Sequence, residues 1–255
     1  MAVHRSKIGW TDFSGGDANF VIGCTPVSEG CANCYAEAII GGRQGRDFSQ
    51  VRLYPEKLTR LRRVRFNDGG ESFRRGPGSK PMVFVVDLGD LFHDDVTTAF
   101  IWAVLDTMWY RKDVTWQILT KRPRRALAFQ QFFEAVYSTS PWSENIWLGF
   151  TGENQRRFDE RAAPFEQISA SVRFVSIEPA LERVVLGDAL DWLDWVIIGA
   201  ESGPNRRDFD LDWARSGRDE CAAAGVPFFY KQGSHLWPGR DDILDGQQWK
   251  QFPNG

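Results

Sequence analysis

The sequence is poor in the features that mark membrane proteins and secreted scaffolds. It has no run of about 20 apolar residues, the length of a transmembrane helix, and its first residues, MAVHRSKIGW, contain no apolar signal segment. Only four of its 255 residues are cysteine, which is few for a disulfide framework. It also lacks internal repeats and low-complexity tracts. We therefore expect a globular protein of the cytoplasm with no membrane partner.

An excess of charge of one sign is also missing. The 31 Lys and Arg nearly balance the 34 Asp and Glu, and a formal net charge of −3 argues against a general affinity for nucleic acid. Residues 43–80 are an exception, since eleven basic and four acidic residues give them +7 and leave −10 for the rest. Residues 64–80 are rich in Gly, Arg and Ser, which predicts an exposed basic loop or lid. The basic stretch is a candidate phosphate-binding rim, with a merely solvated surface as the alternative.

Short apolar segments rich in β-branched and aromatic residues recur through the chain. They lack a clean alternation of apolar and polar residues, which is typical of parallel strands covered on both faces. Their separation favours helical crossovers over hairpins. Residues 20–24 are a candidate seventh strand that leads into a cysteine-rich segment. The six predicted strands are residues 82–88, 115–120, 145–151, 172–178, 195–201 and 227–232.

Three segments between these strands have apolar residues at helical spacing: residues 97–111, 124–137 and 211–225. Asp210 is a suitable N-cap and Gly225 a suitable C-cap for the last of them. The alternation of strands and helices predicts an α/β fold, a partial or complete parallel (β/α) barrel of about six to seven strands. We expect residues 1–255 to form one domain, with residues 43–80 as a basic insertion.

Polar residues follow each predicted strand. In a parallel barrel these positions lie at the carboxyl ends of the strands, where active sites are built. The alternative is that strand ends are polar only because they reach solvent. The residues are Asp87 and Asp90, Lys121 and Arg122, Thr151, Glu153 and Asn154, Glu178, Glu201 and Ser202, and Lys231 and Gln232.

Three of the four cysteines, Cys24, Cys31 and Cys34, fall within eleven residues, whereas Cys221 stands alone. Thiolates select zinc or iron–sulfur centres. A structural zinc needs a fourth ligand, and the three histidines have no zinc-finger spacing to the cluster, although the fold could supply one of them or Cys221. A [4Fe-4S] cluster held by three cysteines instead leaves one iron open for chemistry.

Several ordered motifs resemble the phage Gp37/Gp68 family, also called the three-Cys-motif family, which is placed with the radical SAM superfamily. The resemblance runs from about Lys7 to Gly233. The usual superfamily motif has three residues between its first two cysteines and this chain has six, so its loop must follow a different path. LTKRP also resembles a signature of the spore photoproduct lyase-like branch, which acts on nucleic acid. The motifs are IGWTD (8–12), GCTPVSEGCANCYAE (23–37), DLFHDD (90–95), LTKRP (119–123), GFTGEN (149–154), VRFVSIEPAL (172–181), WVIIGAESG (195–203) and GVPFFYKQ (225–232).

The resemblance implies a [4Fe-4S] cluster on Cys24, Cys31 and Cys34 that cleaves S-adenosylmethionine (SAM) to a 5′-deoxyadenosyl radical, which abstracts hydrogen from a substrate. It also implies an electron donor such as flavodoxin or ferredoxin. Matched by position, the candidates for binding SAM are Asp90 for its amino group, Lys121 for its carboxylate, Thr151 or Glu153 for its ribose, and Tyr35 beside the third cysteine. Glu178, Glu201 and Lys231 are the candidate catalytic residues.

The family's phage context and the basic stretch favour a nucleic-acid base or nucleotide as the substrate. Two alternatives remain open at this point. One is a zinc-stabilised nucleic-acid-binding or interaction protein without catalysis, and the other is a radical SAM enzyme that acts on a peptide or small metabolite.

Overall fold

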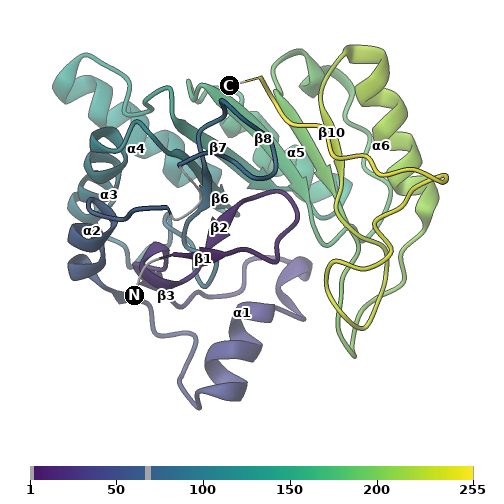
Figure 1. The fold of residues 1–255 in the computed structure, drawn as a ribbon, viewed down its shortest axis with the longest axis horizontal. Helices are drawn as coiled ribbons and strands as arrows, with labels where there is room; N and C mark the ends of the chain where they lie inside the picture. Colours follow the sequence, from purple (N-terminus) through teal and green to yellow (C-terminus); the bar gives the residue numbers. More distant parts are fainter. Residues whose placement is uncertain (1–2, 67–69, 255) are drawn as a thin grey trace.

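A computed structural model describes residues 3–66 and 70–254, and an eight-stranded, curled sheet forms its centre (Figure 1). The strands lie side by side in the order β1-β2-β5-β6-β7-β8-β9-β10. All neighbours in this order are parallel except β1 and β2. The α/β class and the partial parallel barrel are thus confirmed. The strands are β1 His4–Arg5, β2 Phe13–Ser14, β5 Met82–Phe84, β6 Thr115–Thr120, β7 Ile146–Thr151, β8 Val172–Ile177, β9 Trp195–Ile198 and β10 Phe228–Tyr230.

All six predicted strands are present, but the seventh parallel strand is not residues 20–24. It is the short β2, which pairs with β5 through Phe13 and Val83. Residues Val21–Ile22 form β3 of a separate antiparallel pair with β4 (Arg52–Leu53). The backbone turns sharply after β3 at Gly23, where φ is 108° and a Cβ atom would lie 2.5 Å from the Gln50 carbonyl oxygen. This turn sends the chain into the cysteine segment and away from the main sheet.

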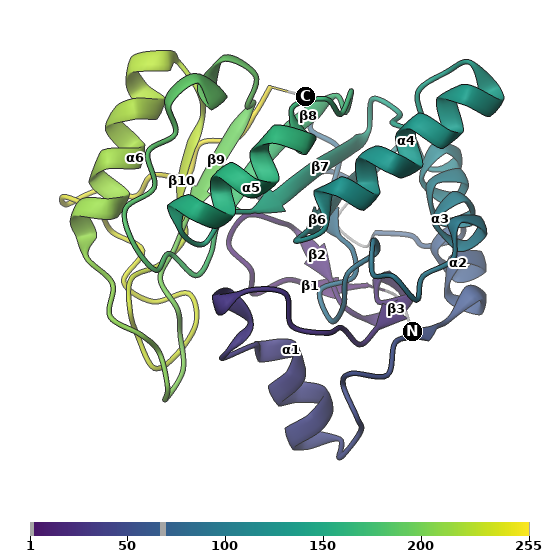
Figure 2. The ribbon, with the colours of Figure 1, turned by 180° about the vertical axis from the view of Figure 1, so that it is seen from behind.

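Helices cover the outer face of the sheet (Figure 2). The three predicted helices are present as α3, α4 and α6. The carboxylate of Asp210 accepts the N–H of Asp212 at the start of α6, and Gly225 ends it with a φ of 71°. Sequence patterning missed α5, which is highly charged. The helices are α1 Tyr35–Glu37, α2 Pro55–Leu61, α3 Thr98–Tyr110, α4 Pro123–Tyr137, α5 Gln155–Phe165 and α6 Leu211–Ala224, with short 3₁₀ turns at Gly16–Ala18, Glu29–Cys31 and Gly187–Asp191 and a π-helix at Ala38–Arg43.

Aromatic side chains fill the concave side of the sheet. Trp10, Trp147, Phe174 and Trp195 are buried there in one cluster, separate from the larger core between the sheet and its helices. Gly149 of β7 has to lack a side chain, because a Cβ atom would lie 2.4 Å from the ring of Phe174. Trp147 and Trp195 lie at the amino ends of their strands, so this packing leaves the opposite, carboxyl edge for polar groups.

Part of the basic segment lies at the amino ends of the strands. Arg75 donates to the hydroxyl of Thr115, the first residue of β6, and its guanidinium lies 5.0 Å from the ring centre of Trp147. The backbone N–H of Arg74 donates to Asp12 over 3.1 Å. Residues 72–80 are therefore packed opposite the carboxyl edge and do not form a lid over it. Of the predicted loop, residues 67–69 lie outside the described residues.

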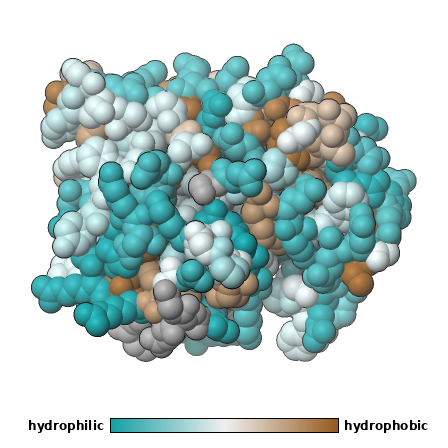
Figure 3. Space-filling view, turned by 45° about the horizontal axis from the view of Figure 1, so that its top comes forward, coloured by the Kyte–Doolittle hydropathy of each residue, from teal (hydrophilic) through white to brown (hydrophobic). Residues whose placement is uncertain are grey.

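The face drawn in Figure 3 is mostly hydrophilic, and its apolar residues form small patches. Tyr110, Phe132 and Tyr137 are exposed aromatic residues of α3 and α4. Across the described ranges, no helix is both long and apolar enough to cross a membrane.

Candidate active site

The cysteine segment, residues 24–34, crosses the carboxyl edge of the sheet. It is held there by side chains that follow β6, β7 and β9, namely Arg122, Glu153, Arg157, Glu201 and Arg207. In Figures 1 and 2, the helix α1 that continues the segment stands below the sheet, apart from the helices of the outer face. The edge at which polar residues were predicted to gather is therefore the edge that holds the cysteine segment.

Asp90 is the buried centre of the contacts at β5 and β6. One carboxylate oxygen accepts hydrogen bonds from the Thr120 hydroxyl (2.8 Å) and the Phe92 N–H (2.9 Å). The other accepts from the Lys121 N–H (3.1 Å) and from Nη1 of Arg122 (3.2 Å). Both oxygens thus have partners within the chain, which makes Asp90 an anchor for the turn after β6.

Arg122 joins Asp90 to the first cysteine. Its Nη1 lies 3.4 Å from the sulfur of Cys24, and its Nη2 donates to the carbonyl (3.0 Å) and hydroxyl (3.1 Å) oxygens of Thr25. Burial lowers the pKa of Arg122, but the negative charges of Asp90 and Cys24 outweigh it and raise the pKa. Arg122 is therefore a fixed cation beside the cysteine segment.

His93 also supports this segment. Its Nδ1 accepts the N–H of Asp95 (3.1 Å), so its Nε2, 2.9 Å from the Thr25 hydroxyl, carries the proton and donates it. Burial and the nearby Arg122 lower the pKa of His93. The neutral imidazole is used to hold Thr25.

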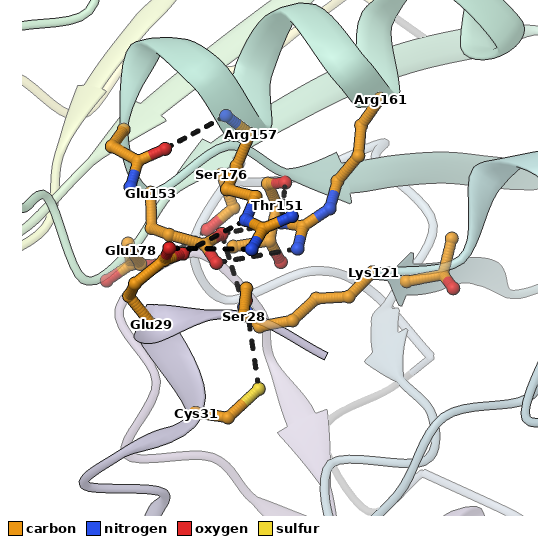
Figure 4. Close-up of polar contacts among 12 residues, drawn as sticks. Ser28, Glu29, Cys31, Lys121, Thr151, Glu153, Arg157, Arg161, Ser176 and Glu178 are labelled. Carbon is orange, nitrogen blue, oxygen red and sulfur yellow. Dashed lines mark hydrogen bonds and ion pairs between the residues drawn. The ribbon is translucent and has the colours of Figure 1, made fainter. Parts of the chain in front are cut away.

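The three cysteines of the segment are free and half-buried. Cys24 and Cys34 pack against one small cluster formed by Ala36, Ile40 and Phe48. Burial and the negative charge of Asp90 raise the pKa of Cys24, Cys31 adds to this rise, and Arg122 opposes it. The sulfur of Cys31 lies 3.8 Å from the Ser28 hydroxyl (Figure 4).

As these side chains stand, no group of three or more His, Cys, Asp and Glu among the described residues is placed to hold a single metal ion. The donor set nevertheless fits a [4Fe-4S] cluster, because three unpaired thiols lie on one short segment beside a fixed arginine. A cluster is larger than one ion and binds thiolates, which the positive charge of Arg122 favours.

Glu153 forms a buried ionic group between the segment and the end of β7 (Figure 4). Its carboxylate accepts from Nη1 of Arg161 at 2.5 Å and lies 3.7 Å from Nζ of Lys121. Burial alone would raise the pKa of Glu153, but Lys121, Arg161 and a hydrogen bond from Ser28 lower it to about 2. Nη1 of Arg161 also donates to the carbonyl oxygen of Thr151 over 2.7 Å. Glu153 is thus a permanent carboxylate that contacts the segment.

Two further groups of side chains hold the segment, one from α5 and one from the residues after β9. Arg156 and Arg157 of α5 pair with Glu29, and Nε of Arg157 lies 2.9 Å from its carboxylate. Glu201 accepts from the side-chain amide of Asn33 (3.0 Å) and pairs with Arg207 (2.8 Å). Arg207 also donates to the carbonyl oxygen of Glu29 over 2.9 Å. Glu201, predicted as a catalytic candidate, therefore holds the loop between the second and third cysteines.

Glu178 and Lys231 form the other polar group, at the ends of β8 and β10. Nζ of Lys231 lies 2.7 Å from one carboxylate oxygen of Glu178. The other oxygen accepts from the Ser176 hydroxyl (3.1 Å) and the Trp10 indole (3.2 Å). Gly199 allows this approach, since its Cβ atom would lie 2.7 Å from Glu178. The structure thus brings together two of the three catalytic candidates.

Tyr35 and several residues that the sequence analysis missed complete the edge. The Tyr35 hydroxyl donates to the backbone carbonyl of Asp87. Among the missed residues, Asn33 had a local signal because it lies between two cysteines. Arg161 and Arg207 had none, since an arginine on a polar helix or loop is ordinarily solvated.

Fold and site together define an α/β partial-barrel protein with a three-cysteine segment anchored across the carboxyl edge of its sheet. Residues 5–253 match a family described as "Protein of unknown function (DUF5131)", and the chain belongs to that family. The fold resembles a solved structure, "Spore photoproduct lyase complexed with dinucleoside spore photoproduct". The TM-score is 0.53 at 10% sequence identity, over 92% of this chain and 78% of that chain. No curated protein sequence matches.

Proposed function

We propose that this protein is a radical SAM enzyme. The observation that carries the proposal is the position of Cys24, Cys31 and Cys34 on a segment clamped across the carboxyl edge of a partial barrel. The likeness in fold to a spore photoproduct lyase supports it, as do the motifs that resemble the phage Gp37/Gp68 family. The cytoplasm suits such a protein, because free thiols persist in a reducing compartment.

The three thiolates would hold a [4Fe-4S] cluster, which supplies the electron and the open iron that reductive cleavage of SAM requires. Arg122 would stabilise the thiolate of Cys24 by its positive charge. Glu29, Asn33, Glu201 and Arg207 would keep the loop from moving as ligands bind. A flavodoxin or ferredoxin is the class of electron donor that this chemistry needs.

Lys121 is the best-placed residue for the carboxylate of SAM. Its side chain is one-fifth exposed and its Nζ is only 3.7 Å from Glu153, so it can contact a second carboxylate at the edge. We assign Asp90 a positioning role for Lys121 and Arg122 rather than a direct contact with the SAM amino group, because both of its oxygens have partners. Thr151 and Tyr35 complete the proposed SAM site, whereas Glu153, whose two oxygens are also paired, positions Lys121.

We propose that the Glu178–Lys231 pair meets the substrate. The pair follows β8 and β10, which lie two and four strands from β6 and its Lys121 in the sheet order, and its side chains are partly exposed. Nζ of Lys231 is close enough to Glu178 for a proton to pass between them. The same Nζ can also exchange a proton with a heteroatom of the substrate. A nucleic-acid base or nucleotide is the proposed substrate, which the dinucleoside in the similar solved structure supports.

Anaerobic reconstitution tests the proposal. We expect a brown protein with iron and sulfide that converts SAM to 5′-deoxyadenosine when a chemical reductant is added. Cys31→Ala, treated in parallel, should have neither colour nor this activity. A colourless wild-type protein with stoichiometric zinc would overturn the proposal in favour of a zinc-stabilised binding protein.

A further inference from the structure

A strongly basic cavity lies beside the cysteine segment, between the first turns of α4 and α5. Its volume is about 330 Å³, and Val27 of the segment forms part of its wall. Six of its ten lining residues are basic: Lys121, Arg122, Arg124, Arg125, Arg157 and Arg161. Asp94 and Glu160 are the acidic ones. The polar contacts described above do not explain why so many positive charges surround one cavity.

Most of these cations have carboxylate partners behind or beside the cavity, but two do not. The side chain of Arg124 is exposed and makes no hydrogen bond or ion pair with another residue in the described ranges. Arg125 donates from Nη2 to the carbonyl oxygen of Val96, and its Nη1 is buried without an acceptor among the described residues. The cavity therefore has two guanidinium groups with donors to spare.

The backbone adds to this positive potential. Helix α4 has 15 residues and starts with Pro123, and the side chain of its N-cap residue, Arg122, makes no capping hydrogen bond. In contrast, Asn154 caps α5 by accepting the N–H of Arg157. No side chain caps the positive end of the α4 dipole, which lies where Pro123, Arg124 and Arg125 line the cavity.

We propose that this cavity binds a phosphate group of the substrate. It combines a helix N-terminus, two guanidiniums with unused donors and enough volume for a phosphate ester, which together suit a tetrahedral dianion. The assignment deepens the proposed function and rests on it for the identity of the phosphate carrier, which is a polynucleotide or a phosphorylated small molecule. The cavity opens between two outer helices, whereas Glu178 and Lys231 lie at the ends of β8 and β10.

Arg124→Glu tests the assignment, because this side chain makes no contact that stabilises the fold. Arg240→Glu is the matched control: Arg240 is exposed, lies outside the basic stretch and has no side-chain partner in the described part of the chain. The probes are inorganic phosphate, a 5′-phosphorylated dinucleotide and its unphosphorylated dinucleoside, titrated by calorimetry. We expect Arg124→Glu to weaken binding of the phosphorylated probes about tenfold or more and Arg240→Glu to leave it unchanged.

If the dinucleotide binds more tightly than inorganic phosphate and the difference depends on Arg124, the result would support a polynucleotide carrier. Equal, Arg124-dependent binding of both would support a phosphorylated small molecule. Unchanged affinity in Arg124→Glu, or displacement of phosphate by SAM, would overturn the proposal. Iron content and SAM cleavage, measured on wild type and on Arg124→Glu, report separately on the proposed function. A wild-type protein that holds no iron after reconstitution, yet binds phosphate in a way that Arg124→Glu weakens, would refute that function and keep the cavity assignment.

Discussion

Gly30 of the cysteine segment lies directly against the side chain of Glu153. A Cβ atom at position 30 would be 2.9 Å from Cδ and 3.0 Å from Oε1 of Glu153. Glu153 is fully buried and tied to Arg161 and Lys121, so it cannot move aside without breaking these ion pairs. The path of the segment between its first two cysteines therefore depends on the absence of a side chain at position 30.

Gly30→Ala should displace the cysteine segment. We expect a loss of stability of about 1 to 3 kcal/mol from overpacking and a clear drop in the iron bound after anaerobic reconstitution. Gly42→Ala is the matched control, because a Cβ atom there meets nothing within 4 Å. Thermal unfolding and iron analysis of both variants check this, and normal iron content in Gly30→Ala would contradict it.

Cys24, Cys31 and Cys34 should each be required for the cluster, whereas Cys221 should not. Cys221 is completely buried in α6, where burial raises the pKa of its thiol to about 12. Cys221→Ala should therefore keep full iron and sulfide content and lose only about 1 kcal/mol of stability to a small cavity. Visible absorbance and iron analysis of the four Cys→Ala variants provide the measurement; a full cluster in Cys31→Ala would refute the assignment.

Glu153→Gln should change how stability depends on pH. The pKa of Glu153 is about 2 in the folded protein, below the ordinary 4.5, so its contribution is complete above about pH 4.5 and is lost as the pH falls towards 2. This shift corresponds to about 3 kcal/mol at neutral pH. Denaturant titrations should therefore show Glu153→Gln much less stable than wild type at pH 7 and closer to it at pH 3.

Glu37→Gln, on an exposed residue of α1, is the control for this comparison and should follow the wild-type curve at both pH values. A gap between wild type and Glu153→Gln that stays the same at pH 7 and pH 3 would show that the carboxylate charge does not stabilise the fold.

Lys121→Ala should weaken SAM binding and leave the cluster in place. The loss of a charge-assisted hydrogen bond to the SAM carboxylate predicts a Kd about 10- to 100-fold higher. Calorimetry on the cluster-loaded protein measures this, with iron content as the check on the cysteine site. Lys112→Ala removes an exposed lysine just after α3 and should leave the affinity as it is. An unchanged Kd in Lys121→Ala would remove Lys121 from the SAM site.

The amino-acid sequence by itself determined the succession of strands and helices. The segments at β6, β7 and β8 are rich in aromatic and β-branched residues without a clean alternation of apolar and polar residues, a pattern typical of a sheet that is covered on both faces. Local chemistry also decided the ends of α6, where Asp210 and Gly225 act on neighbouring backbone groups. The sequence likewise placed the polar residues at one edge, since parallel strands end on the same side.

What these polar residues do was decided only by the tertiary structure. Asp90 and Glu201 remain predictions as SAM and substrate residues, but their partners Arg122 and Asn33 are set by contacts between residues distant in sequence. The same applies to Phe13 in β2, to Arg75 beside Trp147, and to Arg161 paired with Glu153. A charged side chain finds its partner through the path of the whole backbone, and a single sequence carries no local pattern for such a pair.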